Sequence, residues 1–130
     1  MPVARSLSLY FSAGALGGLA NSVVVWAVGH LGLAHVVGAP ALTPGWLYPR
    51  IVWGGLWGAL FLLPVSWGWF RKGLLLSLGP SLVQLFLVFP LKTKAGVLGL
   101  ALGLLTPLAV LFFNAVWGVV ASFWLTVVRA

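Results

Sequence analysis

The sequence predicts an all-α integral membrane protein, a four-helix bundle that forms a single transmembrane domain over residues 1–130. The first observation is composition: 62% of the residues are hydrophobic, 5% are charged, and the mean hydropathy is +1.17. A soluble domain carries about 25% charged residues because water must wet its surface. The second observation is that the apolar residues form long runs, and the third is that the charged residues flank these runs.

The apolar runs are long enough for helices that cross a membrane, which need about 20 mostly apolar residues each. The expected helices cover residues of about 6–29, 44–70, 74–91 and 107–129. The first run is longer than the apolar core of a signal peptide, roughly 7–15 residues, so it is interpreted as a retained helix.

Two threonine-proline pairs mark helix starts, Thr43-Pro44 for the second helix and Thr106-Pro107 for the fourth. Threonine is a good N-cap, and proline is favoured at the first helical position. The glycine-containing segments before these pairs, 30–43 and 95–105, are expected to be connectors.

All seven charged residues are basic. Arg71-Lys72-Gly73 is expected to close the second helix. In a bundle with an even number of helices both termini share one side of the membrane, and here that side has four basic residues against three. The positive-inside rule then places both termini in the cytoplasm, with the protein in a bacterial-type inner membrane. The side of the termini holds Arg5, Arg71, Lys72 and Arg129, and the other side holds Arg50, Lys92 and Lys94.

The chain lacks the side chains on which several kinds of chemistry depend, since it has no Asp, no Glu and no Cys. Thiolate metal sites, carboxylate proton relays, glycosidase carboxylate pairs and acid-supported catalytic triads are therefore excluded. We expect no enzyme activity, no metal and no cofactor. Nucleic acid is not an expected partner, because its binding needs a basic face on a water-soluble body.

An internal repeat is predicted from three short segments that recur in the same order, 67, 63 and 64 residues apart. Two tandem two-helix units, residues 6–66 and 70–129, would then be related by a pseudo-twofold axis along the membrane normal. Chance recurrence of Leu, Gly and Val is the alternative. The pairs are Leu31-Gly-Leu-Ala34 with Leu98-Gly-Leu-Ala101, Leu42-Thr-Pro44 with Leu105-Thr-Pro107, and Val52-Trp-Gly54 with Val116-Trp-Gly118.

Small residues four apart are typical of membrane helices that pack closely. Such stripes in the first, second and fourth helices include Gly14, Gly18, Gly54, Gly58 and Gly118.

Four polar residues continue these small-residue stripes and are expected to face the bundle interior. In the repeat, Asn21 corresponds to Gln84, and Arg50 corresponds to Asn114. One interpretation is that they hydrogen-bond between helices, and the other is that they line a substrate or ion path.

Arg50 and the two histidines are the other candidate site residues. A cation at membrane depth marks a functional site, although Arg50 lies close enough to the helix start to serve as an interfacial anchor. His30 and His35 are five residues apart, which suits a helical metal pair poorly. Either is a possible haem or pigment ligand, or an ordinary solvated histidine.

The third expected helix contains the segments Gly73-Leu-Leu-Leu-Ser-Leu-Gly79 and Gln84-Leu-Phe-Leu-Val-Phe-Pro90-Leu91. In these segments the chain resembles the YagU-type small bacterial inner-membrane proteins. The resemblance implies a membrane location and no defined activity. Those proteins are longer, and they carry acidic residues that this chain lacks.

The function expected from these features is that of a non-catalytic accessory or structural subunit of a membrane complex. Its partners would be membrane lipids and either other membrane-protein subunits or further copies of itself. The alternative is a small oligomeric channel or transporter with a polar path at Asn21/Gln84 and Arg50/Asn114. A third hypothesis is a cofactor-bearing subunit that uses His30 or His35.

Overall fold

The computed structural model describes residues 3–33, 42–63, 66, 68–87 and 106–129. These residues form helices and no strand, so the predicted all-α class is confirmed for the described part of the chain. The described helical segments are four in number, and three of them contain an internal change of helix type or a turn. Their elements are α1 (Val3–Val28) with η1 (Gly29–Leu33), α3 (Pro44–Trp57) with η2 (Gly58–Leu62), α4 (Trp69–Leu76) with α5 (Leu78–Val83), and α6 (Thr106–Arg129).

The ends of the helices follow local sequence signals. The Thr43 hydroxyl accepts a hydrogen bond from the Trp46 backbone N–H at 3.3 Å, and Pro44 occupies the first turn of α3, as the sequence predicts. Gly32 has φ +108° within η1, a backbone conformation that side chains with a Cβ rarely adopt. The regular helical backbone of the first segment is therefore interrupted at Leu31 and Gly32, near its end at Leu33.

The predicted boundary between the second and third helices was wrong. The second helical segment ends at Leu62 instead of 70, and α4 already begins at Trp69. The reason lies in Leu63, whose backbone is extended (φ −65°, ψ 137°), because the proline that follows it in the sequence disfavours the helical conformation. Arg71-Lys72-Gly73 consequently lies inside α4 and does not close the preceding helix.

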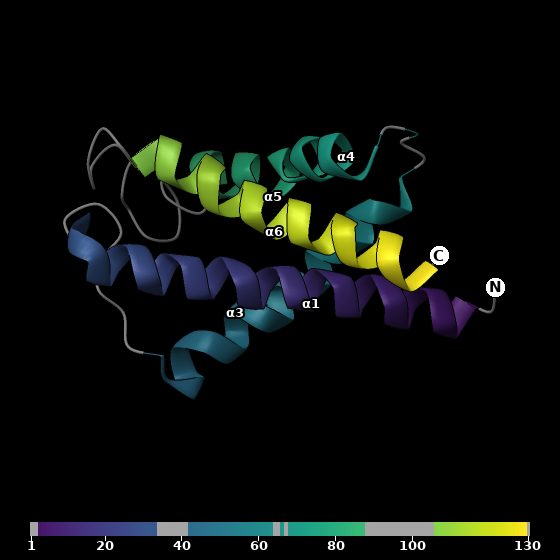
Figure 1. The fold of residues 1–130 in the computed structure, drawn as a ribbon, viewed down its shortest axis with the longest axis horizontal. Coiled ribbons are helices and arrows are strands. Elements are labelled where there is room, and N and C mark those ends of the chain that lie inside the picture. The colour runs from purple at the N-terminus through teal and green to yellow at the C-terminus, as the bar shows by residue number, and fades with distance from the viewer. Residues whose placement is uncertain (1–2, 34–41, 64–65, 67, 88–105, 130) are drawn as a thin grey trace.

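The helices form two pairs that meet through their inner members (Figure 1). One pair is α1 with α3, and the other is α6 with α4 and α5; the pairs join where α1 packs against α6. Within the described residues, α3 and η2 contact α4 and α5 only weakly. The first and last helices thus form the centre of the molecule, and the start of α1 and the end of α6 lie at the same end (Figure 1).

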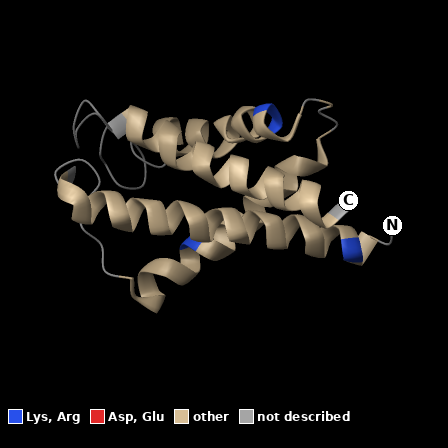
Figure 2. Ribbon diagram, in the orientation of Figure 1, with Lys and Arg blue, Asp and Glu red and all other residues tan. Residues whose placement is uncertain are grey.

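Two of the described helices are long and apolar enough to cross a membrane: Val3–Gly32, with 30 residues, and Pro107–Val128, with 22. Large apolar side chains cover the outside of all the helices, and exposed examples are Phe11 on α1, Trp53 on α3, Phe70 on α4 and Phe112 on α6. Figure 2 shows basic positions on α1, α3 and α4 and no acidic position on the described ribbon.

Glycine allows the backbones of α1 and α3 to touch. A Cβ added at Gly54 would lie 2.8 Å from the carbonyl oxygen of Gly14 and 2.9 Å from the Cα of Gly18. On the other side of the crossing, a Cβ at Gly58 would lie 3.2 Å from the Cα of Gly14. Side chains of any size would separate these helices.

A second close approach joins α4 to α6 at Gly73 and Gly118. A Cβ at Gly73 would lie 2.6 Å from the Gly118 carbonyl oxygen, and one at Gly118 would lie 3.0 Å from the Cβ of Ser77. Between the two crossings lies a core of buried apolar side chains: Ala13, Phe61, Leu76, Trp117, Ala121 and Leu125.

The substitution Gly14→Ala is predicted to destabilise the bundle by about 1–3 kcal/mol, because its methyl group overlaps the backbone of Gly54 and Gly58. Gly45→Ala is the matched control, since nothing lies within 4 Å of its Cβ position. Thermal unfolding in mild detergent measures both. Equal melting temperatures for the two variants would show that α1 and α3 do not touch at Gly14.

Candidate functional site

The candidate site is a polar network in which Arg50 is the only charged member. The backbone of Arg50 lies against α1, since a Cβ at Gly18 would be 2.7 Å from the Arg50 carbonyl oxygen. From there the half-buried side chain reaches one turn along α1. Its Nε donates to Ser22 Oγ at 2.8 Å, and its Nη2 donates to Asn21 Oδ1 at 2.6 Å.

Ser22 and Asn21 are arranged so that their oxygens accept from the guanidinium. The Ser22 hydroxyl donates its own proton to the Gly18 carbonyl at 2.7 Å, and its lone pairs therefore remain for Arg50. Asn21 donates from Nδ2 to the Phe113 carbonyl of α6 at 2.7 Å. Both side chains are buried. One asparagine thus connects α1 with both α3 and α6.

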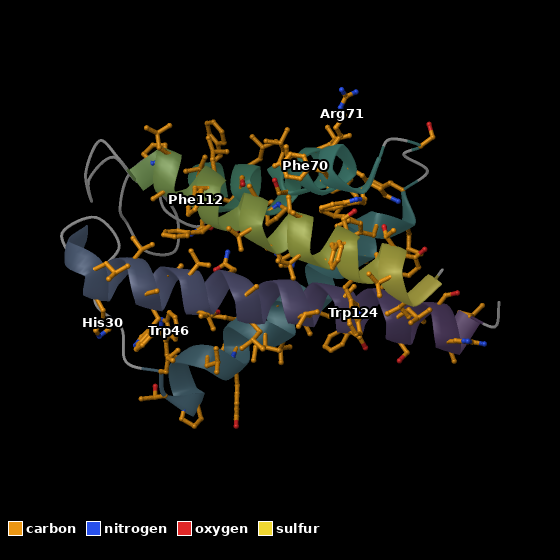
Figure 3. The ribbon with its side chains drawn as sticks, in the orientation of Figure 1. His30, Trp46, Phe70, Arg71, Phe112 and Trp124 are labelled. Carbon is orange, nitrogen blue, oxygen red and sulfur yellow. The ribbon has the colours of Figure 1, made fainter. Side chains whose placement is uncertain are left out.

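An aromatic ring covers another part of the guanidinium. Trp46 lies one turn before Arg50 on α3, and its ring centroid is 4.7 Å from the Arg50 Cζ. At this distance the cation is attracted by the ring quadrupole. Figure 3 shows Trp46 and His30 at the end of the molecule opposite the chain termini.

A second polar cluster, without a charge, joins α5 to α6. Asn114 Nδ2 donates to Ser81 Oγ at 3.1 Å and to Gln84 Oε1 at 3.4 Å. Ser81 is fully buried and donates to the Ser77 carbonyl at 2.9 Å. These neutral hydrogen bonds hold the second helix pair together.

Contacts in the two clusters correspond in pairs under the numbering of the predicted repeat. The Arg50–Asn21 hydrogen bond corresponds to the Asn114–Gln84 hydrogen bond. The backbone contact of Gly18 with Arg50 corresponds to the contact of Ser81 with Asn114.

Arg50 and Asn114, which correspond in the predicted repeat, do not hydrogen-bond to each other. Each residue is held within its own helix pair, Arg50 by α1 and Asn114 by α5. The physical reason is the glycine contact between α1 and α3, which puts Asn21 and Ser22 closest to the guanidinium.

Trp117 is the member of the interior network that the sequence did not indicate. Its Nε1 donates to the carbonyls of Gly14 at 3.1 Å and Gly54 at 3.2 Å, so one indole N–H bridges the crossing of α1 and α3. Every residue has a backbone carbonyl, so a sequence pattern cannot show which carbonyls accept a hydrogen bond from the Trp117 indole. The only available signal was the recurring Val-Trp-Gly, which marked the position without indicating its partner.

His30 is not part of this network. His30 is exposed, its Nδ1 lies 2.8 Å from the Trp26 carbonyl, and its ring centroid is 5.0 Å from that of Trp26. His35, Lys92 and Lys94 lie outside the described residues. Within the described part of the chain, no three residues of types that bind metals come together.

No family model, curated protein or solved structure matches this chain significantly. The resemblance to the YagU-type proteins therefore stays a prediction.

The substitution Trp117→Phe is predicted to cost about 1 kcal/mol, because it keeps an aromatic ring in the core but removes the N–H that bridges Gly14 and Gly54. Trp53→Phe is the matched control, as Trp53 is 62% exposed. Chemical unfolding followed by helical circular dichroism compares them. If both variants unfold like the wild type, the bridge does not stabilise the fold.

Proposed function

We propose that this protein is a non-catalytic structural or accessory subunit of a membrane complex, embedded in a bacterial-type inner membrane with both termini in the cytoplasm. The observation that carries the proposal is the internal use of polar groups. Asn21, Ser22, Arg50 and Trp117 all form hydrogen bonds that join one helix to another or to the backbone of their own helix.

Membrane embedding is supported by the two apolar helices of spanning length and by the apolar outer surface. Phe70, Phe112 and Trp124 are examples, with side chains that are 53%, 55% and 38% exposed. Exposed apolar surface of this extent suits a lipid environment, because contact with lipid avoids the unfavourable free energy of hydrating apolar groups. The absence of acidic residues and the few basic ones support the same environment.

A structural role is favoured over a transport path because both the oxygen and the nitrogen of the Asn21 side-chain amide already form hydrogen bonds within the protein. Asn21 accepts from Arg50 and donates to the Phe113 carbonyl. A substrate that passed between these helices would have to break both bonds, and the glycine contacts leave no room for it at Gly14 and Gly54. The absence of carboxylate and thiol side chains supports a non-catalytic role.

A tandem repeat of two helix pairs is part of the proposal. The corresponding hydrogen bonds of Arg50 and Asn114 support it, as does the glycine crossing within each pair. The two helix pairs resemble each other, but the contacts between the pairs are not symmetric. Under the repeat, the contact of α1 with α6 would correspond to that of α3 with α4 and α5, yet the first is extensive and the second is weak.

A small oligomeric channel or transporter is the second candidate, favoured by the half-buried amides of Gln84 and Asn114. In that case the polar cluster between α5 and α6 would line a path formed with a neighbouring copy.

Purification in mild detergent distinguishes these functions. We expect the protein to migrate on native gels within a complex larger than its own homo-oligomer and to leave liposomes impermeable to ions after reconstitution. A homo-oligomer that raises ion permeability, with the flux abolished by Asn114→Leu and unchanged by the exposed control Phe112→Leu, would replace the structural role by the channel.

A further inference from the structure

We propose that the Arg50 guanidinium binds the phosphate of a membrane lipid, at the junction of α1 and α3. The inference goes beyond a structural role and rests on the membrane embedding proposed above.

The charge of Arg50 has no acidic side chain in this protein to pair with. The sequence contains no Asp or Glu, so no side chain of the chain can supply a carboxylate. The oxygens that Arg50 contacts, Ser22 Oγ and Asn21 Oδ1, are neutral. A cation that is half-buried among apolar helices is costly unless an anion accompanies it. No side chain of the chain can supply this anion, which points to one from outside the chain.

The guanidinium is held in place while retaining donors for such an anion. Arginine has five N–H donors in a planar fork. The bonds to Ser22 and Asn21 engage Nε and Nη2, and Nη1 has no acceptor among the described residues. Trp46 further restricts the group by stacking on it. A preorganised fork of N–H groups suits the oxygens of a phosphate, which it can bind through two hydrogen bonds.

The position of Arg50 favours a lipid phosphate over a carboxylate in the middle of a partner helix. Arg50 lies six residues after Pro44, the first residue of α3, or about 9 Å along the helix axis. A long side chain at this depth can extend toward the headgroup layer. Exposed aromatic side chains lie close by in the sequence, with Tyr48 61% and Trp53 62% exposed, as expected near a membrane interface.

The test is a titration of the full-length protein in detergent, with bound lipid counted by native mass spectrometry. The probe is dioleoyl phosphatidylglycerol, and dioleoylglycerol serves as the control lipid because it has the same chains without the phosphate. Wild-type protein is expected to bind the phospholipid and not the diacylglycerol. Arg50→Gln should weaken phospholipid binding by about 10- to 100-fold, because a charged hydrogen-bonding group is lost.

Two further variants keep the test valid. Arg71→Gln removes an exposed arginine of α4 and should leave the affinity unchanged. Arg50→Lys keeps the charge but loses the planar fork, and an intermediate affinity is expected from it. Circular dichroism confirms that each variant is helical, so that lost binding is separated from lost folding.

Three results would overturn the assignment. Equal phospholipid binding by wild type and Arg50→Gln would remove Arg50 from the site. Displacement of the lipid by inorganic phosphate at equal concentration would identify free phosphate as the ligand. If a transmembrane peptide with a central glutamate bound the wild type in an Arg50-dependent way while the phospholipid did not, the counter-charge would be a carboxylate of a protein partner.

Discussion

The backbone contact between α1 and α3 at Gly14 and Gly54 is the interaction on which the rest of the bundle depends. Because no side chain separates these helices, the Trp117 indole can reach the carbonyls of both glycines from α6. One turn further along, the same proximity brings the guanidinium of Arg50 within hydrogen-bonding distance of Asn21. Packing by small residues therefore determines which polar groups can meet, as it does in closely packed membrane helices.

Composition and apolar periodicity predicted the helical class and the ends of the helices that have strong local signals. The start of α3 at Thr43-Pro44 is an example, because N-capping depends only on neighbouring residues. The break near Leu63 was missed even though Pro64 stands in the sequence, since the apolar run continues through it. The partner of Arg50 could not be predicted either, because it depends on which helices are in contact.

Several polar side chains of the helices are buried, whereas many large apolar side chains are exposed. Arg50, Asn21 and Ser22 are turned toward neighbouring helices, whereas Leu19 and Phe112 are exposed. In lipid this arrangement satisfies the polar groups inside and leaves the apolar groups in their preferred environment. An acidic side chain to accompany the charge of Arg50 is missing, because the sequence contains no Asp or Glu.

Cysteine labelling in sealed membrane vesicles tests the central claim, that the exposed apolar surface faces lipid. The chain has no native cysteine, so single cysteines can be placed at Leu19 or Phe112, which are 37% and 55% exposed, and at Gly45, where a Cβ has no neighbour within 4 Å. A membrane-impermeant maleimide is predicted to label Leu19→Cys and Phe112→Cys only after detergent is added at a denaturing concentration, while Gly45→Cys reacts once the vesicles are opened. Rapid labelling of Leu19→Cys and Phe112→Cys in intact vesicles would place this surface in water and contradict the account.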